Sequence, residues 1–445
     1  GAVAAGMVGM AVWWASEPSP LPVTSLLPLV FIPLIEAGSA REAAAGYSSP
    51  IVMLLLGGLI IALGIERWGL HKRIALNIVS LVGSHPSALI FGFMIATALL
   101  SMWISNTATT LMMVPIAISA AAALKDESGK FVTALLLGVC YAASIGGVAT
   151  PIGTPTNLIA IEWLVQNTGS AIGFGQWMAY GLPAMALLVP IAWWAVTRNL
   201  PHLGDGSAAM REVKTQRREL GGVTAPEARA AIIFGIVALF WVLRVPIQTL
   251  ARSNGWDVPW VMAVSDMGSA VAGASTRFLV PAGKSQNRAI LNWQEAVKLP
   301  WGVLILFGGG ISLGQAVTRT GLSTFVGEQL STLSVLPPIV FIAAVVALVI
   351  FLTELTSNVA TMTTLAPILG ALATAIGAAP ASLLAPAAVA ASCAFMLPVA
   401  TAPNAIIYAT DKVPIGQMIQ RGLRVNLIGV VVITGIGFWL APLVL

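Results

Sequence analysis

The sequence predicts an all-α polytopic membrane protein, and three observations carry this prediction. The chain is 58% hydrophobic and only 9% charged over 445 residues, whereas a soluble domain carries about 25% charged residues. Apolar runs near the length needed to cross a bilayer recur along the chain. A short polar stretch interrupts the apolar sequence once in each half. We therefore expect about 11 transmembrane helices in two inverted repeats, each with a re-entrant helical hairpin and a broken transmembrane helix.

The apolar segments follow one another in a regular order. The first are 1–15, 21–35 and 50–65, and a basic helix from His71 to about Ser80 comes next. Residues 87–104 and 111–124 flank the first polar stretch, and together they suit a hairpin better than one straight span. Residues 131–165 exceed one span and are interrupted by glycines and prolines, which predicts two half-helices.

The middle of the chain is the most polar part. Spans are expected at 176–198 and 230–249, and the segment 198–229 between them is rich in Arg and Lys, which indicates a cytoplasmic loop. A weakly apolar segment at 262–281 is interrupted by Asp266 and Arg277. The net charge of +5 fits short cytoplasmic loops, so it does not suggest a nucleic-acid partner.

The interrupting polar stretch is an internal repeat. Ser105-Asn106 recurs as Ser357-Asn358, 252 positions later, and the stretch 154–157 is echoed at 401–404, 247 positions later. Interrupted apolar segments at matching places in two halves are the best sequence indication of the binding site in a secondary transporter. Buried polar groups cost roughly 2–7 kcal/mol when unpaired, so a bound ligand is expected to compensate for them.

The residue types at the first tip suit both an anion and a cation. Ser105, Asn106 and Thr107 are good N-cap residues, and the first turn of a helix attracts anions through its free N–H groups and dipole. Carbonyl and hydroxyl oxygens beside it are the ligands that Na⁺ takes. Only Glu354 brings charge to either tip. It either pairs with a nearby cation or helix end or tunes the second cation site.

An enzyme is not expected. Ser105 and Ser357 have no neighbouring base in the sequence, and the spacing of Cys and His residues does not form a metal motif. The glycine runs at 57–58 and 308–310 lack the Lys and Ser/Thr of a phosphate loop.

Five stretches resemble the divalent-anion/sodium symporter family of INDY-type di- and tricarboxylate transporters. They are Tyr141–Thr150 (YAASIGGVAT), Gly153–Asn157 (GTPTN), Trp301–Gly310 (WGVLILFGGG), Glu354–Asn358 (ELTSN) and Phe395–Thr401 (FMLPVAT). The resemblance extends over almost the whole chain. It implies a homodimer in the plasma (inner) membrane, with a scaffold domain and a transport domain that moves as an elevator in each protomer.

The resemblance also implies specific ligands, at positions of this sequence that match the family motifs. The substrate contacts would be Asn106, Thr107, Thr154, Asn358, Val359 and Thr401. The first Na⁺ would be held by Ser101, Ser105, Asn106 and Gly153, and the second by Thr353, Thr356, Asn358 and Ala400. The chain departs from common family patterns at Val359, where some members have Thr, and at Thr156 and Ala402, where many have Pro.

The same resemblance divides the chain into segments. Residues 1–86, 176–300 and 301–335 would be mainly scaffold and linking helices, 87–175 and 336–422 the two halves of the transport domain, and 423–445 a C-terminal helix. The leading hypothesis is uptake of a C4-dicarboxylate such as succinate with Na⁺. A sodium-independent exchanger, or citrate or sulfate as the substrate, remains open on the same fold.

Overall fold

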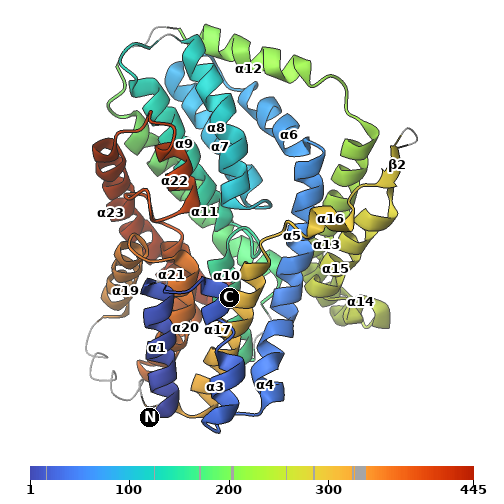
Figure 1. Ribbon diagram of the computed structural model, residues 1–445, viewed down its shortest axis with the longest axis vertical. Coiled ribbons are helices and arrows are strands. Elements are labelled where there is room, and N and C mark those ends of the chain that lie inside the picture. Colours follow the sequence, from blue (N-terminus) through green and yellow to red (C-terminus); the bar gives the residue numbers. More distant parts are fainter. Residues whose placement is uncertain are drawn as a thin grey trace.

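The computed structural model describes residues 1–16, 18–124, 126–169, 172–201, 205–256, 258–283, 286–322, 325 and 337–445. Among these residues the chain is mostly helical, as predicted (Figure 1). Eight helical segments are long and apolar enough to cross a membrane, and five shorter apolar segments accompany them. His202, and residues 323, 324 and 326–335 of the expected scaffold segment 301–335, lie outside the described ranges.

The first half of the chain contains the first hairpin and the first broken helix. They are α1 (Ala2–Ser16), α2 (Leu21–Thr24), α3 (Pro28–Leu34), α4 (Ala40–Ala45), η1 (Gly46–Ser48), α5 (Pro50–Arg67), α6 (Leu70–Val79), α7 (Pro86–Ser101), α8 (Asn106–Ala123), α9 (Lys130–Gly147), α10 (Pro155–Thr168), α11 (Phe174–Thr197) and α12 (Ser207–Glu219).

The second half begins with linking elements and then returns to the pattern of the first. It contains α13 (Ala225–Ser253), α14 (Pro259–Ala263), α15 (Asp266–Leu279), strands β1 (Pro281–Gly283) and β2 (Gln286–Ala289), α16 (Trp293–Ala296), α17 (Trp301–Arg319), α19 (Pro338–Thr353), α20 (Asn358–Ala375), α21 (Ala381–Ala391), α22 (Ala402–Tyr408), α23 (Ile415–Trp439) and α24 (Ala441–Val444).

Two hairpins approach the middle of the molecule from opposite ends. Helices α7 and α8 lie in its upper half and α19 and α20 in its lower half (Figure 1). The second arms, α8 and α20, are each 18 residues long. The first of them is longer than its apolar run suggested, because the polar residues Asn106–Thr110 are helical too. Each hairpin is followed by a helix that breaks, α9 into α10 and α21 into α22.

Helix α9 forms the centre of the upper half. All its residues from 133 to 147 are buried, and it packs against α7, α8 and α11. Gly146 permits this approach, because a Cβ there would lie 2.3 Å from the backbone oxygen of Ala98. The central position of α9 fixes where its broken end lies.

Two elements of the structure were not expected from the sequence. The segment 198–229, expected to be a loop, contains α12, whose residues Ala209, Met210 and Val213 pack inward. Strands β1 and β2 pair as a small antiparallel hairpin after α15. The sequence did not predict either element, because α12 is strongly charged and the two strands are very short.

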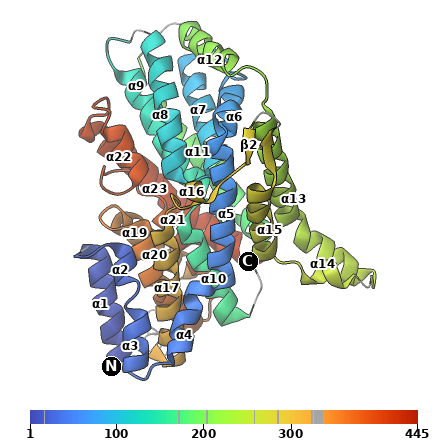
Figure 2. The same ribbon diagram turned by 45° about the vertical axis from the view of Figure 1, so that its right-hand side comes forward.

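The two charged residues that interrupt the segment 262–281 are hydrogen-bonded. Asp266 forms a bidentate pair with Arg244, at 2.6 and 2.9 Å, and the Arg277 guanidinium is fully buried and donates to the Ala230 carbonyl. These contacts explain how α15 tolerates charge beside an apolar helix. Figure 2 shows α13 and α15 side by side, apart from the hairpins.

A cluster at the end of α5 joins it to β2 and α16. Arg67 Nε and Arg288 Nη2 each lie 2.6 Å from a different oxygen of Glu295, and both guanidinium groups lie over the ring of Trp68. Burial raises the pKa of Glu295, but the hydrogen bonds from Arg288, the Asn292 backbone and Arg67 outweigh it and lower that pKa to about 2. The cluster therefore holds a carboxylate at ordinary pH.

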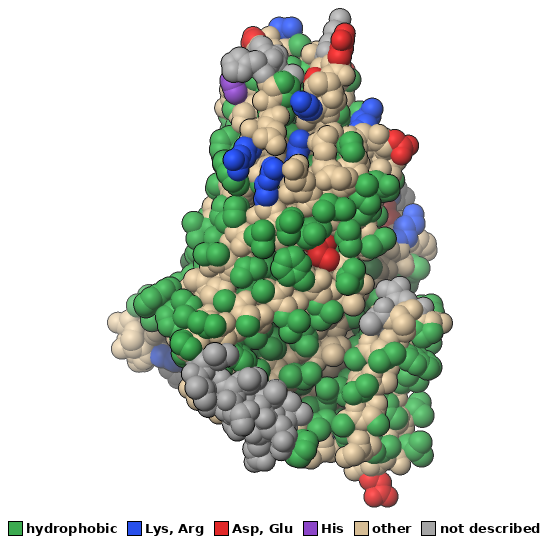
Figure 3. Space-filling model, turned by 90° about the vertical axis from the view of Figure 1, so that its left-hand side faces the viewer, with side chains coloured by type: hydrophobic (Ala, Val, Ile, Leu, Met, Phe, Trp, Pro, Cys, Tyr) green, Lys and Arg blue, Asp and Glu red, His purple; other side chains and the backbone are tan. Residues whose placement is uncertain are grey.

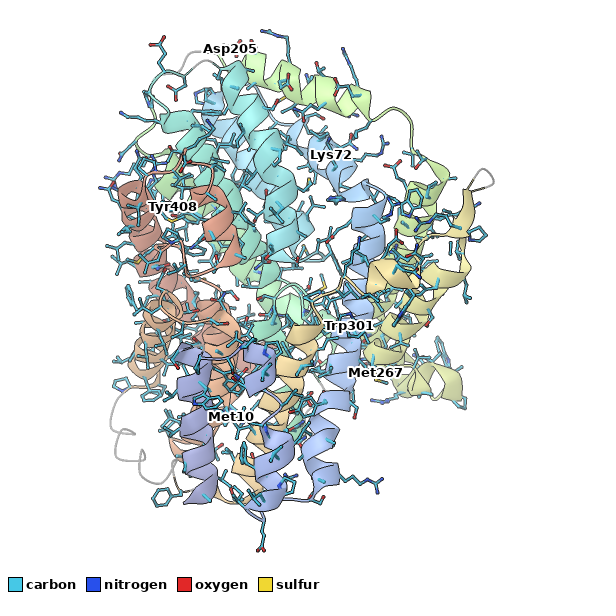
Figure 4. The ribbon with its side chains drawn as sticks, in the orientation of Figure 1. Met10, Lys72, Asp205, Met267, Trp301 and Tyr408 are labelled. Atoms are coloured by element: carbon cyan, nitrogen blue, oxygen red, sulfur yellow. The ribbon has the colours of Figure 1, made fainter. Side chains whose placement is uncertain are left out.

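Hydrophobic side chains cover the middle and lower part of the face in Figure 3, and Lys and Arg side chains gather toward its upper end. This distribution is typical of a protein embedded in a bilayer with its basic end in the cytoplasm. Lys72 and Asp205 lie toward that upper end, whereas Trp301 lies near mid-height (Figure 4).

Candidate functional site

The first tip is closed by hydrogen bonds between the hairpin and the broken helix. Ser101 Oγ lies 2.7 Å from both Asn106 Oδ1 and the Ala143 carbonyl oxygen. Ser105 caps α8, because its hydroxyl oxygen accepts from the N–H of Ala108 at 3.2 Å. The hairpin tip is thereby fastened to α9 just before α9 breaks.

The second tip repeats this arrangement. Thr353 Oγ1 lies 2.7 Å from Asn358 Oδ1 and 3.0 Å from the Ala391 carbonyl oxygen. The hydroxyl of Thr356 bonds to the Leu352 carbonyl at 2.9 Å, within the same hairpin. The sequence repeat is therefore also a repeat of side-chain contacts, in which Thr353 takes the part of Ser101.

Each break in a helix is held by one asparagine. Asn157 Nδ2 donates to the carbonyl oxygens of Gly147 and Thr150, at 3.0 and 2.7 Å. Asn404 Nδ2 likewise donates to the carbonyls of Ala394 and Leu397, at 3.0 and 2.8 Å. Both asparagines are fully buried. They pair backbone groups that the unwound segments would otherwise leave unsatisfied.

Glu354 distinguishes the second copy from the first. Its buried carboxylate accepts from the N–H groups of Phe395, Met396 and Leu397, at 2.7 to 3.1 Å, and from Asn426 Nδ2 at 2.7 Å. The corresponding position of the first copy is Met102, whose backbone carbonyl accepts from the hydroxyl of Thr150. Its contacts are therefore with the unwound segment between α21 and α22 and with Asn426, rather than with a helix end.

Both tips and both breaks face one cavity of about 900 Å³. All six residues expected to contact substrate line it: Asn106, Thr107, Thr154, Asn358, Val359 and Thr401. Of the expected sodium ligands, Ser105, Asn106, Gly153, Thr356, Asn358 and Ala400 line it, whereas Ser101 and Thr353 lie behind the asparagines that they contact. The structure thus brings together every predicted site residue, although it does not by itself assign their roles.

The electrostatics of this cavity come from the backbone. Four helices, α8, α10, α20 and α22, begin at the cavity wall, so four positive dipole ends are directed at one space. No Asp, Glu, Lys, Arg or His is among the described lining residues. Among the described residues there is also no group of three or more His, Cys, Asp or Glu side chains that could hold a metal ion.

Gly147 allows the first tip to approach the broken helix closely. A Cβ placed there would lie 2.7 Å from Asn106 Oδ1 and 3.1 Å from the Gly153 carbonyl oxygen. The Asn106 carboxamide, whose nitrogen would lie 3.3 Å from the same Cβ, therefore packs directly against the backbone at Gly147. Ala394 stands at the corresponding place of the second copy, so the two copies are not identical in this detail.

The sequence did not reveal the apolar part of the cavity wall. Leu355 and Val399 are 73% and 83% exposed, and they line the cavity together with Trp103, Leu111 and Val303. The indole of Trp103 stacks on Phe174 with ring centroids 6.0 Å apart. Leu355 and Val399 are next to the polar motifs in the sequence. Because the surrounding sequence is apolar too, it does not indicate that these two residues line a cavity.

Comparison with known proteins defines the class. The family of sodium:sulfate symporter transmembrane regions matches residues 2–445, and the chain belongs to this family. It is a multi-pass protein of the plasma membrane, and the predicted family membership is confirmed.

Particular relatives are similar over nearly the full length. The sodium-dependent dicarboxylate transporter SdcS of Staphylococcus aureus strain MRSA252 is 38% identical over 451 residues, covering 98% of this chain and 85% of SdcS, and SdcS of strain NCTC 8325 gives the same values. Two solved transporters share the fold. The Alcanivorax borkumensis YdaH transporter has a TM-score of 0.60 at 16% identity, covering 93% of this chain and 88% of that chain. MtrF of Neisseria gonorrhoeae has a TM-score of 0.65 at 13% identity, covering 96% of each chain.

Proposed function

We propose that the chain imports a C4-dicarboxylate such as succinate together with Na⁺. The observation that carries this proposal is the cavity between the two tips, where four helix N-termini converge without a charged side chain among the described lining residues. Helix ends attract anions, but a dianion also needs compensating charge. Bound cations are often the largest local charges in a site, so Na⁺ that arrives with the substrate supplies it.

The proposed roles follow the contacts at each tip. The N–H groups and hydroxyls at the starts of α8 and α20 would bind the carboxylates, through Asn106, Thr107, Asn358 and the backbone of Val359. Na⁺ would be held at each tip by the oxygens grouped around Asn106 Oδ1 and Asn358 Oδ1, which gives two sodium ions per protomer. The name of the SdcS relatives, a sodium-dependent dicarboxylate transporter, supports this substrate class.

The same proposal includes the motion and the assembly. The two hairpins and broken helices would form the transport domain, 87–175 and 336–422, and would move as an elevator against a scaffold in a homodimer. Crosslinking of cysteine pairs across the two domains would test the motion, and light scattering in detergent would test the assembly. Transport by a protein whose two domains are crosslinked in one arrangement would contradict the elevator motion. A fully active monomer would contradict the homodimer.

Transport in proteoliposomes tests the central claim. Uptake of labelled succinate should require an inward Na⁺ gradient, and uptake that is indifferent to that gradient would refute symport. Counterflow driven only by internal dicarboxylate would favour the exchanger instead. Competition by unlabelled citrate and sulfate identifies the substrate, because the preferred anion should displace succinate at the lowest concentration.

Substitutions at the tips test the site. Asn106→Ala and Asn358→Ala should each abolish uptake while expression and monodispersity are retained, because each removes a tip amide that faces the cavity. Asn254→Ala is the matched control, since Asn254 is exposed and its side chain bonds only locally. Normal uptake by both tip variants would refute the site assignment.

A further inference from the structure

Helix α12 carries basic side chains that remain unpaired. Lys214, Arg217 and Arg218 are exposed, and none forms an ion pair with an acidic side chain in the described ranges. The three line a depression of about 280 Å³. Helix α12 lies across the upper end of the molecule (Figure 1), where the positive-inside rule places the cytoplasmic surface of the bilayer.

Glu212 of α12 contacts a neighbouring helix, whereas Glu219, at the end of α12, is exposed. Glu212 Oε1 accepts from Ser119 Oγ of α8 and from Gln216 Nε2, both at 2.8 Å. Met210 and Val213 are buried. Glu212 is therefore engaged with α8, while Lys214, Arg217 and Arg218 remain exposed.

Exposed apolar side chains adjoin the cationic depression. Arg217 Nη1 donates to Ser80 Oγ at 3.3 Å, and the next residue, Leu81, is 84% exposed. Val223, just beyond the C-terminal end of α12, is 62% exposed. A soluble anion would need only the cations. A cationic depression beside exposed apolar residues suits a molecule with an anionic head and an apolar tail.

We propose that Lys214, Arg217 and Arg218 bind the headgroup of an anionic phospholipid, with its acyl chains beside Leu81. Basic clusters on amphipathic helices at the cytoplasmic surface attract anionic lipids, and each Lys or Arg contributes to the attraction. Because α12 also contacts α8 through Ser119, a bound lipid lies within two contacts of the second arm of the first hairpin. This binding site is separate from the cavity and does not depend on the transported substrate.

Native mass spectrometry of the purified full chain tests the proposal. Wild-type protein should retain phosphatidylglycerol and not phosphatidylcholine. The triple variant K214Q/R217Q/R218Q should bind phosphatidylglycerol at least about tenfold more weakly. The control R41Q/R252Q/K298Q removes the same charge from three exposed positions elsewhere and should bind as wild type does. Both variants are first checked for a monodisperse elution profile.

Three results would overturn this assignment. Equal retention of phosphatidylglycerol by the two triple variants would show that α12 is not the site. Equal retention of phosphatidylcholine by the wild type would show that the anionic headgroup is not recognised. Displacement of phosphatidylglycerol by millimolar inorganic phosphate would show a site for a free anion, whereas a lipid site should keep its ligand because the acyl chains remain bound.

Discussion

Glu354→Gln should destabilise the protein strongly, because the carboxylate holds the break after α21. A carboxylate only accepts hydrogen bonds and so matches four donors, but a Gln offers one oxygen. If that oxygen keeps the bonds to Phe395, Met396 and Asn426, the N–H of Leu397 faces an amide NH₂.

The size of the effect follows from these contacts. The orphaned N–H costs about 1–3 kcal/mol, and each of the three remaining bonds loses about 1 kcal/mol as it falls from charge-assisted to neutral strength. The sum is on the order of 5 kcal/mol, which is a large part of the net stability of a folded domain. We expect the apparent melting temperature to fall by about 5–10 °C, since larger proteins shift by fewer degrees per kcal/mol.

Elution of intact protein from a size-exclusion column after stepwise heating in detergent would measure this shift. Met102→Leu is the control, because Met102 is the buried counterpart of Glu354 in the first copy and a volume-conserving change there costs less than about 1.5 kcal/mol. A Glu354→Gln variant that melts within the error of the wild type would refute the view that the carboxylate supports the break.

Three further predictions concern the site and the ion-pair cluster. Gly147→Ala should raise the Na⁺ concentration needed for half-maximal uptake, because the methyl group would lie 2.7 Å from Asn106 Oδ1. Titration of uptake with Na⁺ measures this concentration. An unchanged value would argue against a cation beside Asn106. Val359→Thr should lower the KM for succinate several-fold by restoring a hydroxyl at the second tip, and an unchanged KM would place the carboxylate elsewhere. Because the folded pKa of Glu295 lies near 2, below the ordinary value of 4.5, its pairing with Arg288 stabilises the fold fully above pH 4.5 and progressively less as the pH falls toward 2. Melting temperatures of wild type and Glu295→Gln should therefore converge over that interval, and a constant difference would contradict the pairing.

The repeat of the sequence accounts for most of what was predictable. Identical Ser-Asn pairs between apolar runs indicated two hairpins, and the residues of both tips do line one cavity. The hairpins could be predicted because polar residues in apolar sequence are conspicuous. The depth at which the tips meet is a tertiary property, and no local pattern encodes it.

Other features depended on contacts between distant segments. The bonds from Glu354 to Phe395 and Met396 join residues more than 40 positions apart, so the sequence left two roles open for this carboxylate. The helix α12 was interpreted as a loop because its charge masks the few apolar residues that pack inward. The apolar cavity wall at Leu355 and Val399 could not be predicted, because the neighbouring sequence is apolar as well.

The asparagines that hold the two helix breaks lower the entropy cost of ligand binding. Asn157 and Asn404 fix the unwound backbone through their own hydrogen bonds, so occupancy does not require chain segments to become ordered. Association should then lose little affinity to conformational entropy. Calorimetry should accordingly lack the large negative heat-capacity change that accompanies coupled folding.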